Sequence, residues 1–296
     1  MVLTRAQADA PRLVDLPALP RPGRVLMTTP AYFEVAYVIN PHMEGNKGSV
    51  DQVKARRQWR ALHDQYRELG LDVAEVEGVY GLADMVFCAN QTLRFTRPDG
   101  TRGVVLTRMH AEQRKGEVPH YAEFFAGEDY EVHRLDDDLA GTFEGMGDAL
   151  WHPGRRLLWG GYGFRTDRGV YDRLAGFLDT TVCALRLDDP DFYHLDTCLA
   201  PLDEHTALVF PGAFDEDGLA LIRRYFDRVI EAPEDEARGL FACNAHCPDE
   251  RHVIIQKGCT VTNRRLREAG FEPIEVDTGE FLKSGGSVFC MKLMFW

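Results

Sequence analysis

Residues 148–161 read Asp148-Ala-Leu-Trp-His-Pro-Gly-Arg-Arg-Leu-Leu-Trp-Gly-Gly161: a polar residue, an apolar strand, a turn and a second apolar strand. A Pro-Gly pair between two apolar runs predicts a β-hairpin. Similar segments begin at Asp84, Asp196 and Asn244. The stretch therefore predicts a structural unit that the chain repeats.

Most of these predicted hairpins are followed by a helix and a further strand. Ser49 can cap a helix that ends at Gly70, and residues 71–76 then form a strand. Further helices are predicted over residues 219–230 and 261–269. Units of about fifty residues with the order strand–strand–helix–strand predict an α/β fold whose units repeat radially around an axis.

The composition is that of an ordinary soluble globular protein, with 296 residues, 45% of them hydrophobic and 27% charged. The net charge of −13 argues against nucleic acid and anionic membrane surfaces as partners. Seven cysteines without framework spacing, no secretory signal and no apolar stretch of membrane-spanning length predict a cytoplasmic protein with reduced thiols. Residues 1–23, with several prolines, predict an N-terminal tail or arm, and residues 24–296 a single domain.

In a radial repeat the starts of equivalent strands face a common centre, so polar residues there are candidates for a functional site. These residues are Asp84, Asn90, Glu144, Asp148, His194, Asp196, Asn244 and Cys290. Cys290, in a predicted apolar strand, follows Gly285-Gly286, whose backbone can turn sharply and pass close to a ligand. His194 and Asp196 would share one face of a strand, as an acid–base pair does. A cysteine, a histidine and a carboxylate are the components of an activated thiolate.

Simpler interpretations exist for the same residues. A lone cysteine in an apolar segment is more often a small buried hydrophobe, and His194 and Asp196 are also compatible with a surface strand. Cys243 and Cys247, with two nearby histidines, suggest zinc, but a second cysteine pair is missing. We therefore expect no metal.

Six motifs, in order along the chain, resemble those of the guanidino-group modifying enzymes, which include dimethylarginine dimethylaminohydrolases, arginine deiminases, arginine dihydrolases and amidinotransferases. The motifs are Thr29–Asn40, Leu82–Asn90, Phe143–Asp148, Gly161–Asp167, His194–Thr197 and Gly285–Cys290. The resemblance covers residues 25–296. It implies a five-bladed α/β propeller with pseudo-fivefold symmetry, an arginine-like substrate and a cysteine nucleophile.

The resemblance also implies roles for individual residues. Cys290 matches the nucleophile, His194 the general acid/base, and Glu144 the carboxylate that holds the guanidinium and orients the histidine. The implied substrate-binding residues are Asp84, Asn90, Arg108, Arg165, Asp196, Asn40 and Asp148. Among these, the two arginines look like the pair that binds the α-carboxylate.

Two positions shape the expected specificity. Deiminases and dimethylargininases usually carry aspartate where this chain has Asn90, and the asparagine resembles the arginine dihydrolase branch. Dimethylargininases tend to lack an acid at the position of Asp196. An acid there would contact a second guanidinium nitrogen, which favours an unmethylated group.

We therefore expect a cysteine-dependent hydrolase that acts on the guanidino carbon of L-arginine or a close analogue, without metal or organic cofactor. Formation of a covalent thiouronium intermediate would release ammonia, and its hydrolysis would give citrulline. A second hydrolysis would give ornithine, CO2 and more ammonia if Asn90 serves as in the dihydrolases. The alternatives are a dimethylarginine dimethylaminohydrolase, an amidinotransferase that passes the amidino group to an amine, and a non-catalytic binding propeller. The expected partner is a small cationic guanidino substrate, and a homodimer is the default expectation for a soluble enzyme.

Overall fold

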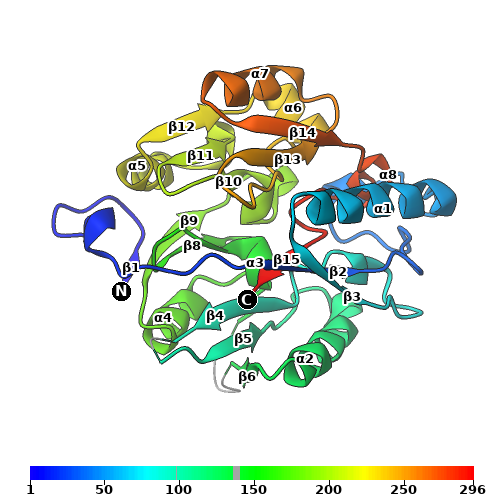
Figure 1. The fold of residues 1–296 in the computed structure, drawn as a ribbon, viewed down its shortest axis with the longest axis horizontal. Helices are drawn as coiled ribbons and strands as arrows, with labels where there is room; N and C mark the ends of the chain where they lie inside the picture. The colour runs from blue at the N-terminus through cyan, green and yellow to red at the C-terminus, as the bar shows by residue number, and fades with distance from the viewer. Residues whose placement is uncertain (98, 136–140) are drawn as a thin grey trace. The chain divides into compact units, whose positions relative to one another are not determined.

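The computed structural model describes residues 1–97, 99–135 and 141–296. Within these ranges the strands form five separate sheets with helices beside them, which is a mixed α/β fold (Figure 1). The chain divides into two compact units: unit 1 consists of residues 1–21 and 148–275, and unit 2 of residues 22–147 and 276–296. No helix in the described ranges is both long and apolar enough to cross a bilayer.

The first sheet of unit 2 joins the C-terminal strand to an N-terminal one. β15 (Leu293–Phe295) pairs antiparallel with β2 (Arg24–Thr28), and β2 pairs parallel with β3 (Asp72–Val76). A parallel pair needs a crossover connection, which α1 (Gln52–Glu68) supplies. The predicted helix and the strand after it are confirmed, but the helix cap is Asp51 instead of Ser49, because the Asp51 carboxylate accepts the N–H of the third helical residue at 3.0 Å.

The second sheet of unit 2 has the same construction. β4 (Thr92–Thr96) pairs antiparallel with β5 (Arg102–Leu106), and β5 pairs parallel with β6 (Glu131–Arg134). α2 (Val118–Gly127) precedes β6 and packs against β5 and β6 (Figure 1).

Unit 1 contains the hairpin from which the repeat was inferred. β7 (Ala149–Trp151) pairs antiparallel with β8 (Leu157–Tyr162), and Gly154 in the turn has a φ of +76°, which favours glycine. β8 pairs parallel with β9 (Thr181–Arg186) after α4 (Gly169–Phe177). The predicted hairpin is therefore confirmed.

The second sheet of unit 1 repeats this construction. β10 (Leu199–Pro201) and β11 (Thr206–Val209) form a hairpin, and β11 pairs parallel with β12 (Arg228–Glu231) after α5 (Glu216–Tyr225). The predicted helix over residues 219–230 was thus too long at its end. Residues 228–231 pair with β11, and this tertiary pairing overrides the local helical periodicity.

The last sheet is the smallest. β13 (His252–Gln256) and β14 (Glu272–Val276) lie side by side, with α7 (Thr260–Glu268) between them in the chain. The predicted hairpin at this point is reduced to a single antiparallel bridge between His246 and Ile254. The remaining helical segments are α3 (Gly145–Asp148), α6 (Glu234–Leu240), α8 (Gly279–Leu282), η1 (Leu13–Asp15), η2 (Pro41–Met43), η3 (Ala83–Val86), η4 (Glu112–Glu117), η5 (Pro190–Phe192), η6 (Leu195–Thr197) and η7 (Pro211–Ala213).

The N-terminal residues pack along unit 1. β1 (Val2–Leu3) adds a parallel strand to the edge of β9. Arg224 donates to the carbonyl of Ala10 at 2.8 Å, and the backbone N–H of Arg156 donates to the carbonyl of Pro17 at 2.8 Å. Strand pairing, one side-chain hydrogen bond and one backbone hydrogen bond therefore hold the N-terminal segment against the rest of unit 1.

Candidate active site

Cys290 lies in a turn, so the prediction that it sits within a strand was wrong. Residues 288–291 form the turn, closed by the N–H of Met291 donating to the carbonyl of Ser287 at 3.2 Å, and β15 begins only at Leu293. The sharp turn predicted before it is confirmed, since Gly285 has a φ of +84°. The Cys290 side chain is buried, at 2% exposure.

Three segments of unit 2 meet at Ala89. Its backbone N–H donates to the carbonyl of Cys290 at 3.2 Å, and its carbonyl accepts from the N–H of Met146 at 2.8 Å. Ala89 directly precedes Asn90, and Met146 follows Glu144 by two residues. Two backbone hydrogen bonds therefore join the segments of three predicted site residues.

Glu144 is fully buried and fixed in the same unit. Its Oε1 accepts the backbone N–H of His110 at 2.9 Å. Gly145 has a φ of +56°, and a Cβ there would lie 2.7 Å from the carbonyl oxygen of Asn90, so the chain needs glycine for this close approach. Arg108 exchanges backbone hydrogen bonds of 3.0 and 2.9 Å with the residue before Glu144.

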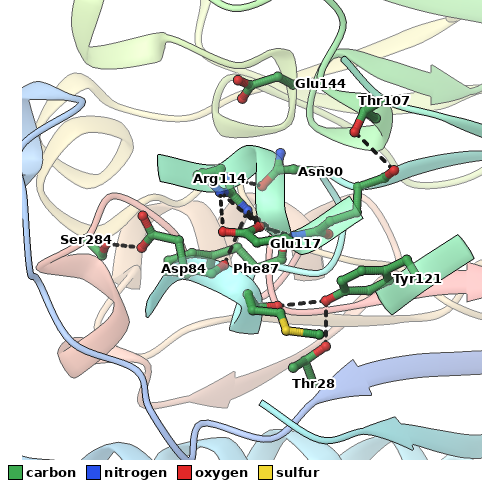
Figure 2. A network of polar contacts seen from close by, with 12 residues as sticks. Thr28, Asp84, Phe87, Asn90, Thr107, Arg114, Glu117, Tyr121, Glu144 and Ser284 are labelled. Carbon is green, nitrogen blue, oxygen red and sulfur yellow. Dashed lines mark hydrogen bonds and ion pairs between the residues drawn. The ribbon is translucent and has the colours of Figure 1, made fainter. Parts of the chain in front are cut away.

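Asp84 and Asn40 are linked through Ser284. The Ser284 hydroxyl donates to Oδ1 of Asp84 at 2.8 Å, as Figure 2 shows, and Nδ2 of Asn40 donates to the Ser284 carbonyl at 3.0 Å. Unit 2 thereby connects, through hydrogen bonds, the segments that carry Asn40, Asp84, Asn90, Arg108, Glu144 and Cys290.

Sequence reasoning missed Arg114 and Glu117, which form a buried ion pair at 2.9 Å beside these residues (Figure 2). Burial raises the pKa of Glu117, against the opposing effect of Arg114. Burial also lowers the pKa of Arg114, but Glu117 and Asp84 outweigh it and the pKa lies well above the usual value. The only local signal is a charge pair at i and i+3, which is typical of an exposed helix face.

The remaining predicted residues belong to unit 1, and here the predicted strand around His194 was wrong. Residues 195–197 form a 3-10 turn, because the N–H of Thr197 donates to the carbonyl of His194 and the N–H of Leu195 donates to Oδ1 of Asp148 at 3.0 Å. His194 and Asp196 are each 1% exposed, which overturns the surface-strand alternative. The carbonyl of Asp196 accepts from the amide of Asn244 at 2.9 Å.

Asp148 also holds the segment of Arg165. Its Oδ2 accepts the hydroxyl of Thr166 at 2.7 Å, while its Oδ1 binds the loop of His194. The Arg165 guanidinium lies over the ring of Tyr193, 4.8 Å from its centroid. Asp148 therefore positions two predicted site residues, and a direct contact of its carboxylate with substrate stays a prediction.

Six cysteines have properties that argue against a nucleophilic role. Burial raises the pKa of three of them to about 12, and it raises the pKa of the other three as well. A thiol with a raised pKa stays protonated and reacts poorly. The first three are Cys88, Cys247 and Cys259, and the others are Cys183, Cys198 and Cys243.

Comparison with known proteins gives concordant results. The model of the family described as N,N dimethylarginine dimethylhydrolase, eukaryotic, matches residues 32–294. The bifunctional arginine dihydrolase/ornithine cyclodeaminase ArgZ of Synechocystis sp. is 40% identical over 280 residues, which cover 91% of this chain and 37% of ArgZ. The chain therefore spans little more than a third of that bifunctional relative.

A second relative is similar over most of its own length. The N(G),N(G)-dimethylarginine dimethylaminohydrolase of Mycobacterium tuberculosis is 39% identical over 274 residues, 93% of this chain and 86% of that protein. Among solved structures, the N-terminal domain of ArgZ bound to its product has a TM-score of 0.85 at 39% identity, covering 92% of this chain and 97% of that one. The chain therefore belongs to the N,N dimethylarginine dimethylhydrolase family, within the guanidino-group modifying enzymes.

Proposed function

We propose that this chain is a cysteine-dependent hydrolase that acts on the guanidino carbon of L-arginine or a close analogue. The observation that carries this proposal is the junction at Ala89, where backbone hydrogen bonds join the segments of Cys290, Asn90 and Glu144. The 40% identity to ArgZ, whose name includes arginine dihydrolase, supports the choice of substrate.

The substrate's own charge prepares the nucleophile. A guanidinium carbon is a poor electrophile because its charge is delocalised, so the group must be held in place before attack. Glu144 and Asp196, both buried, are the carboxylates proposed to bind its N–H groups. A bound cation beside Cys290 favours the thiolate over the thiol, because an opposite charge lowers a thiol pKa.

The proposed first reaction has two halves. The Cys290 thiolate bonds to the guanidinium carbon, His194 as imidazolium gives a proton to the leaving nitrogen, and the C–N bond breaks to release ammonia. A thiouronium on Cys290 remains. Neutral His194 then takes a proton from water as the water oxygen bonds to the same carbon. The S–C bond breaks, and citrulline and the thiolate are released.

Asn90 is the residue on which a second hydrolysis is proposed to depend. Citrulline carries a neutral ureido group, and an amide can bind such a group better than a carboxylate, which only accepts hydrogen bonds. A second water would convert citrulline to ornithine, CO2 and ammonia. Because ArgZ is named an arginine dihydrolase, its similarity supports this step.

A dimethylarginine dimethylaminohydrolase is the second candidate, supported by the family match and by the relative from Mycobacterium tuberculosis. In that case the leaving group is dimethylamine. A mass-balanced product analysis separates the candidates, with arginine, N,N-dimethylarginine, and arginine plus glycine as substrates. We expect citrulline, ornithine and ammonia from arginine. An enzyme that leaves arginine untouched, or that transfers the amidino group to glycine, contradicts the proposal.

We also propose that the five sheets are the blades of a five-bladed α/β propeller formed by residues 24–296 as a single domain, with residues 1–23 as an arm. The shared order of an antiparallel pair followed by a parallel crossover in four sheets supports it. A crystal structure without approximate fivefold symmetry would contradict it. A cytoplasmic homodimer stays a prediction, which fractionation and sedimentation would check.

A further inference from the structure

Arg114 makes a set of hydrogen bonds that ends on Asn90. Its Nη1 donates to Oδ1 of Asn90 at 2.9 Å, and its Nη2 donates to the carbonyls of Asp84 and Phe87 at 3.2 and 3.3 Å. Its Nε and Nη2 also donate to the Glu117 carboxylate (Figure 2). The side chain is 4% exposed, so these partners, and not water, surround the guanidinium.

This contact fixes which way the Asn90 amide faces. A guanidinium carries only donors, so the Asn90 atom at 2.9 Å must be the oxygen. A flipped amide would set its NH2 group against the N–H of Arg114, and both would lose a hydrogen bond. Figure 2 shows the amide nitrogen directed away from Arg114, toward the side on which Glu144 lies.

The Asn90 amide nitrogen is itself unused by the chain. Asn90 is 2% exposed, and its Nδ2 has no hydrogen-bond partner among the described residues. A buried donor without an acceptor is unfavourable and is a position at which a ligand atom can bind. Asn90 therefore presents a hydrogen-bond donor, its Nδ2, and not an acceptor to a bound ligand.

Glu117 and Gln91 hold Arg114 in this orientation. Glu117 is fully buried and accepts from Arg114 and, at 2.6 Å, from Nε2 of Gln91. The carboxylate pairs the charge of Arg114, so the cation persists without solvent. The orientation of the Asn90 amide is consequently set by a buried, hydrogen-bonded ion pair of the protein and not by the ligand.

The Nδ2 donor of Asn90 distinguishes arginine from citrulline, the substrates of the two proposed hydrolysis steps. A guanidinium has only N–H groups and offers Nδ2 of Asn90 nothing to bind, whereas the ureido group of citrulline has a carbonyl oxygen. We propose that Arg114 is a positioning residue which commits Asn90 to donate to the ureido oxygen, and so retains citrulline for the second hydrolysis. This inference rests on the proposed function.

The test compares affinities for the two substrates in a Cys290→Ser background, where turnover is removed. The double change Arg114→Gln with Glu117→Gln removes both buried charges together and leaves an amide that can accept from Asn90. We expect the Kd of citrulline to rise at least about tenfold, and that of arginine to change less than about threefold, as measured by calorimetry. Active enzyme with the same two changes should release more citrulline per ornithine formed.

A matched control carries the same chemical changes elsewhere. Arg155 and Glu204 form an ion pair at 2.8 Å in unit 1, and Arg155→Gln with Glu204→Gln should leave both affinities within about twofold. Adding Asn90→Ala gives a double-mutant cycle. If Arg114 acts through Asn90, the Arg114/Glu117 change has no further effect on citrulline binding in the Asn90→Ala protein.

Several outcomes would overturn the inference. Equal weakening of arginine and citrulline would show a purely structural role, and an additive cycle would show that Arg114 does not act through Asn90. If the double variant does not fold, Arg114→Lys keeps the charge opposite Glu117 but cannot donate in the same fork, and it should show the same selective loss. Failure of the proposed function is separate, because it appears in the wild-type enzyme as no product from arginine.

Discussion

The backbone N–H of Ala89 donates a hydrogen bond to the carbonyl of Cys290, at 3.2 Å. This contact fixes the turn that carries the cysteine through main-chain atoms alone. The cysteine side chain takes no part in it, so a change of the side chain leaves the anchor in place. Function and folding at this position can therefore be tested apart.

Cys290→Ser should abolish turnover and leave the fold intact. A serine hydroxyl is a far weaker nucleophile than a thiolate, so we expect kcat with arginine to fall by at least about 1,000-fold. Circular dichroism and thermal unfolding should match the wild type. Cys247→Ser is the control and should keep its activity, since burial raises the pKa of Cys247 to about 12. Retained activity in Cys290→Ser would remove this residue from the mechanism.

An arginine-like haloacetamidine should label one cysteine per chain. Six of the cysteines have pKa values raised by burial and should stay unreactive thiols, which leaves Cys290 to be alkylated. Intact mass and peptide mapping measure the number and position of the adducts. Protection by added arginine would show that the label enters the substrate site, and labelling spread over several cysteines would argue against it.

Glu236→Ala should lower the free energy of unfolding by about 2 kcal/mol. Glu236 lies on α6 and caps α7: its carboxylate accepts the backbone N–H groups of Val261 and Thr262 at 2.7 and 2.8 Å. These N–H groups have no partner within their own helix, so the loss leaves them unsatisfied. Urea unfolding measures the change.

The control for this cap is Glu234→Ala in the same helix. The Glu234 side chain is 68% exposed and pairs with Arg238 at 2.8 Å. An exposed pair contributes little, so we expect a loss within about 0.5 kcal/mol. Equal losses for the two variants would mean that the cap is not what stabilises α7.

Because of His152, the free energy of unfolding should fall as the pH drops from neutral into mild acid. Burial lowers its pKa to about 4, below its ordinary value of 6.5. As the pH falls from 7 to 4 the unfolded chain gains a proton on His152 and the folded chain does not, so stability is lost over this window. The difference in pKa corresponds to about 3 kcal/mol.

His152→Gln tests this pH dependence. The imidazole accepts from Nε1 of Trp159 at 3.2 Å and contacts the carbonyl of Glu204 at 2.9 Å, and a glutamine amide can accept and donate in the same two places. Between pH 7.5 and 4.5 the variant should lose about 2–3 kcal/mol less unfolding free energy than the wild type. Parallel pH curves for the two proteins would show that His152 does not titrate differently in the folded state.

The amino-acid sequence by itself determined the repeating unit. The hairpin at Pro153-Gly154, the helix ending near Gly70 and the strand after it follow from turn chemistry and from the spacing of apolar residues over a few positions. These signals are local, because each lies entirely within the segment whose structure it predicts. The same holds for the residue types of the candidate site, which the motifs present in order.

Tertiary structure alone decided how those residues are held. His194 lies in a tight turn because Asp148, distant in sequence, accepts the N–H of the next residue, and no local pattern contains that contact. Arg114 looks like an exposed helical charge until the fold buries it against Glu117 and Asn90. Burial converts an ordinary charge into a fixed donor, because removing water leaves each polar group only the partners that the packing provides.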